Sequence, residues 1–194
     1  MDELSTYLQS TFKLAPEESG IFLASFSRVE LKKNELFAQQ GQICNQIGLI
    51  AKGLVKCAFY RDGNEVVFEF AYENSFIADY YSFLTRSPSE KEIRCLEDTT
   101  VYTISRSALE KLAKAHPFVL AMSEKMNEGL FLRMHTRLKS LLLETPLERY
   151  RKLIAERRDL SERIPQYLLA SYLNVKPETV SRIRKKIAAK PFLD

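Results

Sequence analysis

Residues 165–187 constrain the fold more than any other part of the sequence, because they predict two short helices joined by a tight turn. Ala170 is small enough to let the second helix cross closely over the first, and Asn174 suits a turn position with positive φ. Pro177 fits the first turn of the second helix. The apolar positions recur at helical spacing: Leu168, Leu169 and Leu173 in the first helix, and Val180, Ile183 and Ile187 in the second. The segment therefore predicts a helix-turn-helix.

The outward face of the second helix is polar and basic, in a pattern that suits DNA. Glu178 and Arg182 lie one turn apart, where a carboxylate can accept from cytosine N4 and a guanidinium can clasp guanine O6 and N7. We therefore predict base contacts from Glu178, Ser181 and Arg182. Phosphate contacts, which fix register without reading sequence, are expected from Lys176, Thr179, Lys185 and Lys186. The alternative is a basic helical hairpin that is only a solvated surface.

The distribution of charge favours DNA binding. The net charge of the 194-residue chain is only +4, but residues 1–132 carry 14 Lys and Arg against 18 Asp and Glu, whereas residues 133–194 carry 15 against 7. The basic excess thus lies in the part that contains the predicted helix-turn-helix. This is the electrostatic pattern of a DNA-binding end attached to a neutral or acidic sensor or assembly domain.

The first half of the chain changes from helical to two-residue periodicity. Helices are predicted over 2–12 and 16–26, the second with acidic residues in its first turn after Pro16. Between residues 27 and 105, apolar and polar residues alternate in short runs that are separated by turn signals. The predicted strands are 29–31, 46–50, 54–60, 65–70 and 100–104. Short strands at this spacing predict a sandwich or barrel.

A long helix is predicted after Pro117, following a short helix over 106–115 that Ser105 caps. It should end near Leu143, before Pro146, and its roughly 25 residues at 1.5 Å each would make it about 40 Å long. Its apolar stripe comprises Met122, Met126, Leu130, Met134, Leu138 and Leu141. The stripe is longer than a small β-domain covers, so we predict a parallel homodimer along it. The alternative is that the flank of the β-domain buries the stripe within one chain.

Composition excludes several classes of protein. No apolar run approaches the ~18 residues of a membrane span, and the acidic N-terminus lacks the apolar region of an export signal. Three scattered cysteines, Cys44, Cys57 and Cys95, favour a reducing compartment, the cytoplasm, over a disulfide framework. The two histidines, His116 and His135, lie outside the predicted strands. We therefore expect no metal, haem or other cofactor, and no enzyme of the metal-dependent cupin type.

The order of helices, β-roll, long helix and helix-turn-helix resembles the Crp/Fnr family of bacterial transcription regulators over nearly the whole chain. The strongest motif is the recognition-helix signature Glu-Thr-Val-Ser-Arg-Ile at 178–183. Weaker matches in the β-roll are Gln40-Gly41, Ile47–Ile50, Lys52–Lys56, Glu65–Phe68, Asn74–Ile77, Pro88, Ile93, Asp98 and Ile104.

The resemblance implies an α+β chain with an N-terminal double-stranded β-helix, or jelly roll, of the cyclic-nucleotide-binding type and flanking helices. It divides the chain into a sensor domain at 1–116, a dimerisation helix at 117–144 and a DNA-binding domain at 145–194. It further implies a non-enzymatic homodimer that places two recognition helices in successive major grooves of double-stranded DNA. RNA polymerase and an unidentified small-molecule effector are further candidate partners.

The residues with which the family binds cyclic AMP are not retained. Those members carry Gly-Glu after a Phe, but here Ala78 stands where the carboxylate should be and Asp79 is one residue late. They also carry an Arg that pairs with the cyclic phosphate; Ser89 replaces it, Glu90 adds a negative charge, and Arg86 could substitute only if the loop rearranged. We therefore predict a degenerate effector pocket, without cyclic-AMP binding, that comprises Phe76, Ile77, Ala78, Asp79, Ser89, Glu90 and Met134.

Two further questions stay open at the level of sequence. Residues 1–43 contain no cysteine for an iron–sulfur cluster, so the nature of any signal is undefined. Six aromatic residues either fill the roll or line a pocket for a less anionic effector: Phe68, Phe70, Phe76, Tyr80, Tyr81 and Phe83. The alternative function is a cyclic-nucleotide-binding signalling module whose C-terminal helices contact a protein, which the basic C-terminal segment disfavours.

Overall fold

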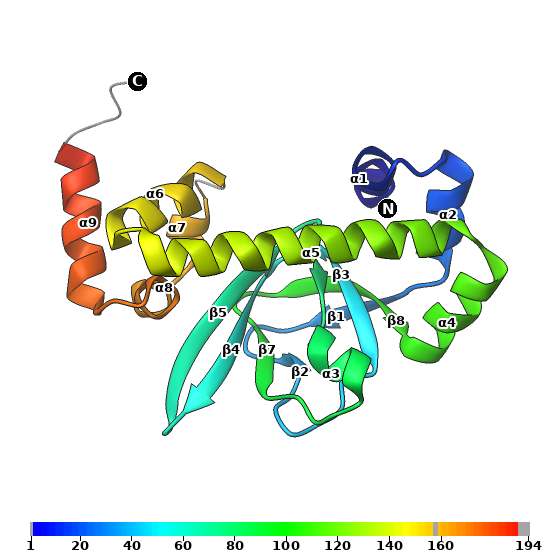
Figure 1. Cartoon of the computed structure of the whole chain (residues 1–194), viewed down its shortest axis with the longest axis horizontal. Coiled ribbons are helices and arrows are strands. Elements are labelled where there is room, and N and C mark those ends of the chain that lie inside the picture. The colour runs from blue at the N-terminus through cyan, green and yellow to red at the C-terminus, as the bar shows by residue number, and fades with distance from the viewer. Residues whose placement is uncertain (1, 157–158, 190–194) are drawn as a thin grey trace.

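The computed structural model describes residues 2–156 and 159–189, which form a β-roll with helices around it (Figure 1). The N-terminal helices are α1 (Asp2–Phe12) and α2 (Pro16–Ala24). The strands are β1 (Ser27–Leu31), β2 (Leu36–Ala38), β3 (Gln46–Lys52), β4 (Leu54–Arg61), β5 (Asn64–Tyr72), β6 (Phe76–Ile77), β7 (Lys91–Cys95) and β8 (Thr99–Ser105). The other helices are α3 (Tyr80–Thr85), α4 (Arg106–Ala115), α5 (Phe118–Leu143), α6 (Pro146–Glu156), α7 (Leu160–Arg163), α8 (Gln166–Leu173) and α9 (Pro177–Ala189).

Two antiparallel four-stranded sheets make up the roll, with strand orders β1-β8-β3-β6 and β2-β7-β4-β5. The α+β class and the jelly-roll architecture predicted from the sequence are confirmed. All five predicted strands are present, at β1, β3, β4, β5 and β8. Strands β2, β6 and β7 are additional; the first two have only three and two residues, too few to show alternation. Strand β5 lies at the edge of its sheet, which matters for the position of the C-terminal helices.

Three apolar clusters hold the chain together. The first lies inside the roll, around Ile50, Val55, Ile93 and Val101. In the second, α1, α2, α4 and the first half of α5 pack on the outside of the β3–β8 sheet. The third joins α6–α9 to the outer side of β4 and β5, through Leu54, Val67 and Phe70. The C-terminal helices therefore share a core with the roll.

Turns with positive φ connect the strands of the roll. Gly53, at φ +117°, separates β3 from β4, and a Cβ there would lie 2.7 Å from the Thr99 backbone, so only glycine fits without displacement. Asp62, Asn74 and Asn174 adopt the left-handed conformation that Asp and Asn tolerate. Ser105 caps α4 by accepting a 3.2 Å hydrogen bond from the Ala108 N–H, as its sequence predicts.

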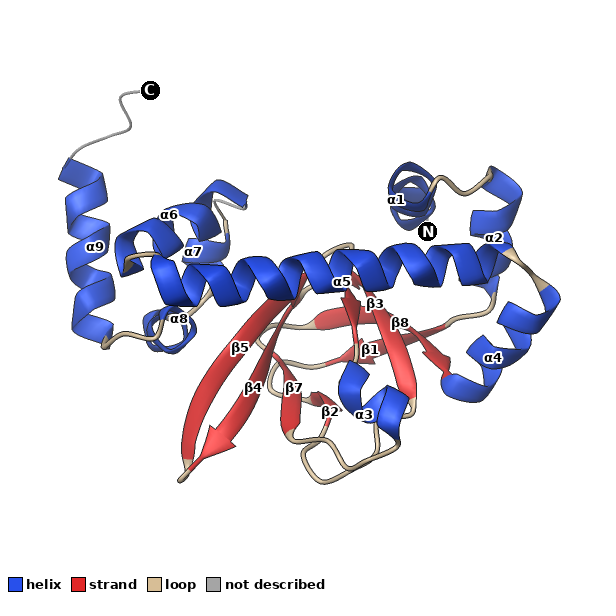
Figure 2. Ribbon diagram, viewed as in Figure 1, coloured by secondary structure: helices blue, strands red, loops and turns tan. Residues whose placement is uncertain are grey.

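Helix α5 runs along the length of the molecule, with α1, α2 and α4 near its start and α6–α9 near its end (Figure 2). Its bounds match the helix predicted from Pro117 to about Leu143, and the chain continues in α6 at Pro146. None of the helices in the described part of the chain is long and apolar enough to cross a membrane.

Candidate DNA-binding face and effector sites

Helices α8 and α9 form the predicted helix-turn-helix. Asn174 takes φ 54° and ψ 52° at the end of α8, and its N–H donates to the carbonyls of the preceding turn. The Val175 N–H donates to the Ala170 carbonyl at 3.0 Å, which closes the turn. Leu169, Leu173 and Val180 are fully buried in the shared core, with Leu168, Ala170 and Ile183 nearly so. The apolar side of the motif is therefore the predicted one.

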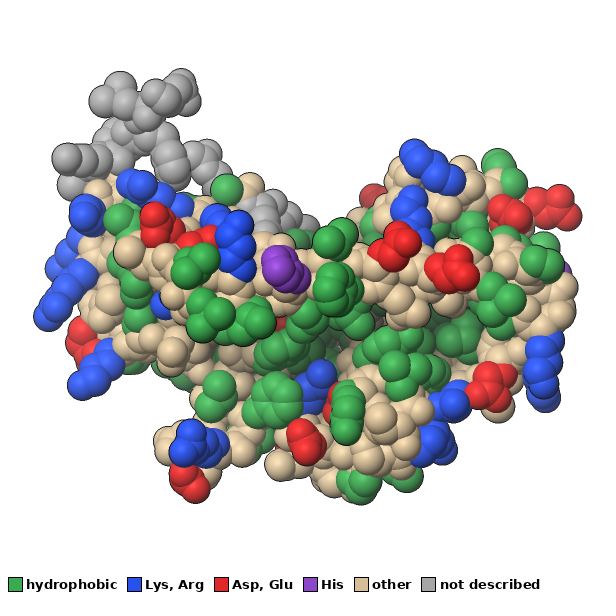
Figure 3. Space-filling view, viewed as in Figure 1, with side chains coloured by type: hydrophobic (Ala, Val, Ile, Leu, Met, Phe, Trp, Pro, Cys, Tyr) green, Lys and Arg blue, Asp and Glu red, His purple; other side chains and the backbone are tan. Residues whose placement is uncertain are grey.

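The opposite side of α9 is open to solvent. Glu178, Arg182, Lys185 and Lys186 are exposed, and Ser181 and Thr179 are half-buried. None of the four exposed charged residues pairs with a residue that the structure describes. Figure 3 shows Lys and Arg side chains gathered at the end of the molecule where α9 lies. The predicted base-contacting and phosphate-contacting residues thus lie together on one accessible face.

Arg184 is a basic residue of α9 with a different role. Its guanidinium donates to the Tyr150 hydroxyl at 3.2 Å and to the Ser161 carbonyl at 2.7 Å. It therefore anchors α9 to α6 and to the start of α7. Its neighbours Lys185 and Lys186 are exposed, so packing and not composition alone decides which basic residues of α9 face the solvent.

The apolar stripe of α5 is only partly available to a partner. Met122 is buried and Met126 half-buried, and both pack into the core between α5 and the helical flank of the roll. Including Met122 in a dimer interface is wrong, because the first half of α5 covers its own roll. The exposed apolar residues lie mainly on the second half: Leu120, Phe131, Leu132, Leu138, Leu141, Leu142 and Leu143. Of the predicted stripe, Leu138 and Leu141 stay exposed, and Leu130 and Met134 are half-buried.

The predicted effector pocket inside the roll holds a polar cluster of the chain's own side chains. Ser89 is buried, and its hydroxyl donates to the buried carboxylate of Asp79. The Lys91 ammonium forms an ion pair with Asp79 at 3.4 Å and lies 5.4 Å from the centroid of the Phe68 ring. Asp79 also caps α3 by accepting from the Ser82 N–H. The position that the family uses for a cyclic phosphate is thus next to an internal carboxylate.

This geometry shows where the other residues of the predicted pocket lie. The Asp79 carboxylate faces Ser89, although Asp79 is one residue late in the sequence. Glu90 is exposed, so the negative charge beside Ser89 comes from Asp79. Arg86 is exposed on the far side of α3, where its guanidinium donates to Asn45, and does not replace the missing arginine. Ile77 belongs to the core inside the roll, whereas Phe76 packs with Phe12 and Phe22 outside it.

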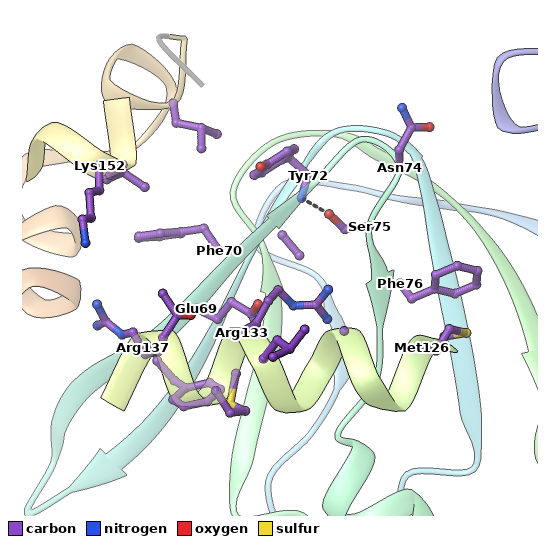
Figure 4. A pocket seen from close by; sticks show the side chains of 18 of the residues that line it. Glu69, Phe70, Tyr72, Asn74, Ser75, Phe76, Met126, Arg133, Arg137 and Lys152 are labelled. Atoms are coloured by element: carbon purple, nitrogen blue, oxygen red, sulfur yellow. Dashed lines mark hydrogen bonds between the residues drawn. The ribbon is translucent and has the colours of Figure 1, made fainter. Parts of the chain in front are cut away.

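A cavity of about 650 Å³ lies between β5 and α5 (Figure 4). Phe68, Phe70, Phe76 and Met134 line it, as expected of a pocket, whereas Tyr80, Tyr81 and Phe83 do not. Its basic lining residues outnumber the acidic one, Glu69: they are Lys125, Arg133, Arg137, Arg149 and Lys152. Burial raises the pKa of the Glu69 carboxyl, an effect that the nearby Arg133 guanidinium opposes.

The helix-turn-helix is fixed to the roll by contacts that the sequence analysis does not anticipate. The Ser171 hydroxyl accepts from the Val67 N–H at 2.9 Å and donates to the Glu65 carbonyl at 3.1 Å, so it satisfies the open edge of β5. Beside it, Arg137 donates to the Tyr172 carbonyl and lies 3.8 Å from the centroid of that ring.

Arg163, in α7, forms the second attachment. Its guanidinium pairs with Glu73 at 2.8 Å, with Asp159 at 3.0 Å and with Glu97. Burial would raise the pKa of Glu73, but hydrogen bonds from Arg163 and from the Gly53 N–H outweigh it and lower that pKa to about 2. Glu73 and Glu97 follow strands 90 and 66 residues earlier in the chain, so no local pattern could have indicated this network.

Among residues 2–156 and 159–189, no group of three His, Cys, Asp or Glu side chains is arranged to hold a metal ion. Cys44, Cys57 and Cys95 are buried free thiols, and burial raises the pKa of each.

The fold is similar to that of known proteins. Residues 28–116 match the family of cyclic nucleotide-binding domains. No curated protein sequence is significantly similar to this chain. Among solved structures, FixK2 from Bradyrhizobium japonicum is similar, with a TM-score of 0.74 and 18% identity over 87% of this chain and 89% of that one.

Two further structures extend this likeness. A mutant of CooA from Carboxydothermus hydrogenoformans has a TM-score of 0.69 and 16% identity over 97% of this chain and 86% of its own. The catabolite activator protein of Thermus thermophilus has a TM-score of 0.58 and 23% identity over 91% and 85%. Residues 28–116 are therefore similar to cyclic nucleotide-binding domains, and the chain as a whole shares its fold with solved structures of Crp/Fnr transcriptional regulators.

Proposed function

We propose that this chain is a homodimeric, sequence-specific DNA-binding transcription regulator whose roll does not bind cyclic AMP. The observation that carries the proposal is the outward face of α9, where Glu178, Arg182, Lys185 and Lys186 are exposed over a fully packed helix-turn-helix core. Exposed arginine and lysine on a helix of this kind can enter a major groove and neutralise phosphates on either side. A basic helical hairpin that served only as a solvated surface would not require so well packed a core beneath it.

The dimer follows from the second half of α5. Seven large apolar side chains of this helix are exposed, and a contiguous apolar strip of this kind marks a protein interface. Two α5 helices packed in parallel would bury Leu138, Leu141 and Leu142 and would place two α9 helices on one side of the assembly. In this arrangement residues 1–116 are the sensor domain, 117–144 the dimerisation helix and 145–194 the DNA-binding domain.

The absence of cyclic-AMP binding follows from Asp79 and Ser89. A cyclic phosphate at this position would lie against the buried Asp79 carboxylate, with no guanidinium in reach to compensate. The Lys91 ammonium already pairs with that carboxylate. A buried anion facing another anion is strongly unfavourable, so the roll acts as a scaffold at this site. Contact with RNA polymerase and regulation of target genes belong to the same proposal.

The test of DNA binding is a charge substitution on α9 with a matched control. An operator is selected from random duplexes with the full chain, and affinity is measured by fluorescence anisotropy. Arg182→Ala should weaken binding about 5- to 100-fold and relax the preference for one base pair. Arg151→Ala removes an exposed cation from α6 and should change affinity less than twofold.

The salt dependence provides a second measurement on the same operator. Between about 50 and about 200 mM salt, affinity should fall steeply, because Lys176, Lys185 and Lys186 displace counterions from phosphates. A flat response, or an Arg182→Ala variant that binds like the wild type, would show that the C-terminal helices contact something other than DNA.

A further inference from the structure

The exposed side of α5 lies opposite the side that packs on the rest of the chain. In a helix with 3.6 residues per turn, Phe131, Leu138 and Leu142 fall within one narrow stripe. Their side chains are 69%, 58% and 72% exposed. Met122, which packs into the core of its own chain, lies on the other side of the helix. Figure 3 shows hydrophobic side chains on the outward side of α5.

His135 is a polar side chain within this apolar stripe. It is exposed, and its ring stacks on Phe131 with 6.4 Å between the ring centroids. Residues 131, 135, 138 and 142 follow the alternating spacing of four and three by which two helices form a coiled coil. We call these four residues the seam. A single polar residue in such a seam fixes the register of the two helices at a cost in stability.

The proposed parallel dimer brings the two copies of His135 together. Two-fold symmetry places the same level of both α5 helices side by side, so each seam residue meets its own counterpart. The layers before and after the histidine pair consist of Phe131 and Leu138, which exclude water from it. The two imidazole rings are therefore in contact with each other in a largely apolar surrounding.

Charges on α5 itself do not neutralise this pair. Residues 129–143 contain neither Asp nor Glu, and Lys139 lies one turn after His135 on the same side of the helix. Glu128 is exposed but lies two turns before His135. Glu144, one residue beyond the helix, already forms an ion pair with α6. A positive charge on His135 would therefore have another cation, and no carboxylate, within one turn.

Charged residues of the elements packed against α5 lie on its other side. Glu69 of β5 lines the cavity there, together with Arg133 and Arg137 of α5. Within the part of the chain that the structure describes, no hydrogen bond or ion pair involves His135. In the single chain His135 is thus hydrated, whereas in the dimer its surroundings are the seam and its own counterpart.

We infer that His135 makes the α5 dimer, and with it operator binding, sensitive to pH; this inference rests on the proposed dimer. Histidine is the side chain that ordinarily gains its charge between about pH 8 and about pH 5. Two neutral imidazoles fit the seam, but two imidazolium groups beside two Lys139 ammonium groups repel each other, and the apolar layers strengthen this repulsion. Dimerisation therefore excludes protons, so by linkage the dimer is favoured at higher pH and is lost as the pH falls.

The test measures the dimer Kd of the full chain by sedimentation equilibrium at about pH 8 and about pH 6. For the wild type, Kd should rise about tenfold or more on acidification. His135→Leu should dimerise more tightly, with a Kd that changes less than about twofold, because its seam is apolar at both pH values. His135→Lys should dimerise weakly at both, because lysine ordinarily stays charged throughout this range.

His116 provides the matched control, because it is the other histidine of the chain. It is half-buried at the end of α4, beside Phe118, and does not belong to the seam. His116→Gln should keep the pH response of the wild type. Thermal melts at both pH values check that each variant is folded, and the exposed position of His135 leaves the core of the single chain unaltered by its replacement.

Three results would overturn the inference: a wild-type dimer with the same Kd at both pH values, a dimer that tightens on acidification, or a His135→Leu variant that keeps the wild-type response. If the wild type and His135→Leu were both monomeric at both pH values, the proposed dimer would fail together with the inference. DNA binding by α9 is measured separately at about pH 8, so the first three results leave the proposed function untouched.

Discussion

Loss of Arg163 should loosen the C-terminal helices α6–α9 from the roll. Its guanidinium is 20% exposed, and its partners Glu73, Glu97 and Asp159 are 27%, 38% and 43% exposed. Partial exposure screens each ion pair to about 1 kcal/mol or less. Arg163→Ala removes all three together with the buried stem of the side chain, so we expect a loss of about 2 kcal/mol.

This loss is large enough to measure in two ways. For a chain of this size, about 2 kcal/mol lowers the melting temperature by about 4–8 °C. Hydrogen exchange should accelerate in α7 and α8 more than in β3, because the attachment is local. Arg28→Ala removes a well-exposed pair with Glu30 and should cost about 0.5 kcal/mol or less. If Arg163→Ala melts like Arg28→Ala and exchange in α7 and α8 is unchanged, the network does not hold the two units together.

The same network predicts that the folded chain loses stability as the pH falls. Burial raises the pKa of Glu73, but hydrogen bonds from Arg163 and from the Gly53 N–H outweigh burial. They hold this pKa at about 2 in the folded chain, below its ordinary value of 4.5. Glu73 therefore contributes stability above pH 4.5 that is lost as the pH falls toward 2. After discounting for solvent screening this contribution is about 1 kcal/mol. In Arg163→Ala the loss of stability over this range should be smaller than in the wild type; an unchanged slope would contradict the assignment.

Three further predictions address the other parts of the molecule. Calorimetry with cyclic AMP should give no binding heat, because Asp79 and Ser89 replace the phosphate partner; micromolar affinity would contradict this. Leu142→Asp should shift the sedimenting species from dimer to monomer without lowering helix content, since Leu142 is exposed in the single chain; an unchanged dimer would place the interface elsewhere. Asn174→Gly should leave the melting temperature nearly unchanged, whereas Asn174→Val should lower it, because φ 54° suits only Gly, Asn and Asp; equal melting of the two would refute the strained turn.

The periodicity of apolar residues is sufficient to predict the longer helices and strands of this fold. Helix α5, the pair α8 and α9, and five strands all repeat their apolar spacing often enough to be read directly. Strand β6 has two residues, and β7 has five with only two apolar positions, Ile93 and Cys95, so neither repeats the alternation often enough to be recognised. Periodicity also fails to say what an apolar stripe packs against. Met122 belongs to the predicted stripe, but only the tertiary structure shows that its own roll covers it.

The candidate sites also differ in how far the sequence predicts them. The face of α9 is predictable because one helix carries all of its residues. The pocket in the roll is not, because Asp79 and Ser89 come from different segments and their contact depends on how α3 starts. Ser171 and the long-range pairs of Arg163 have no sequence signal, since apart from Asp159 their partners lie 66 to 106 residues earlier. Sequence reasoning thus finds sites built on one element and misses those built between elements.

Ser171 shows how the roll can set the position of the recognition helix. Strand β5 is an edge strand, and its outward N–H and carbonyl groups would otherwise need water or another strand. Ser171 satisfies the N–H of Val67 and the carbonyl of Glu65 with one hydroxyl, which fixes α8 to a defined register along β5. Helix α9 follows α8 after a turn with fixed dihedral angles at Asn174, so its direction is set relative to the same strand. The contact between Ser171 and β5 and the turn at Asn174 therefore fix the position of the exposed basic side of α9 relative to the roll.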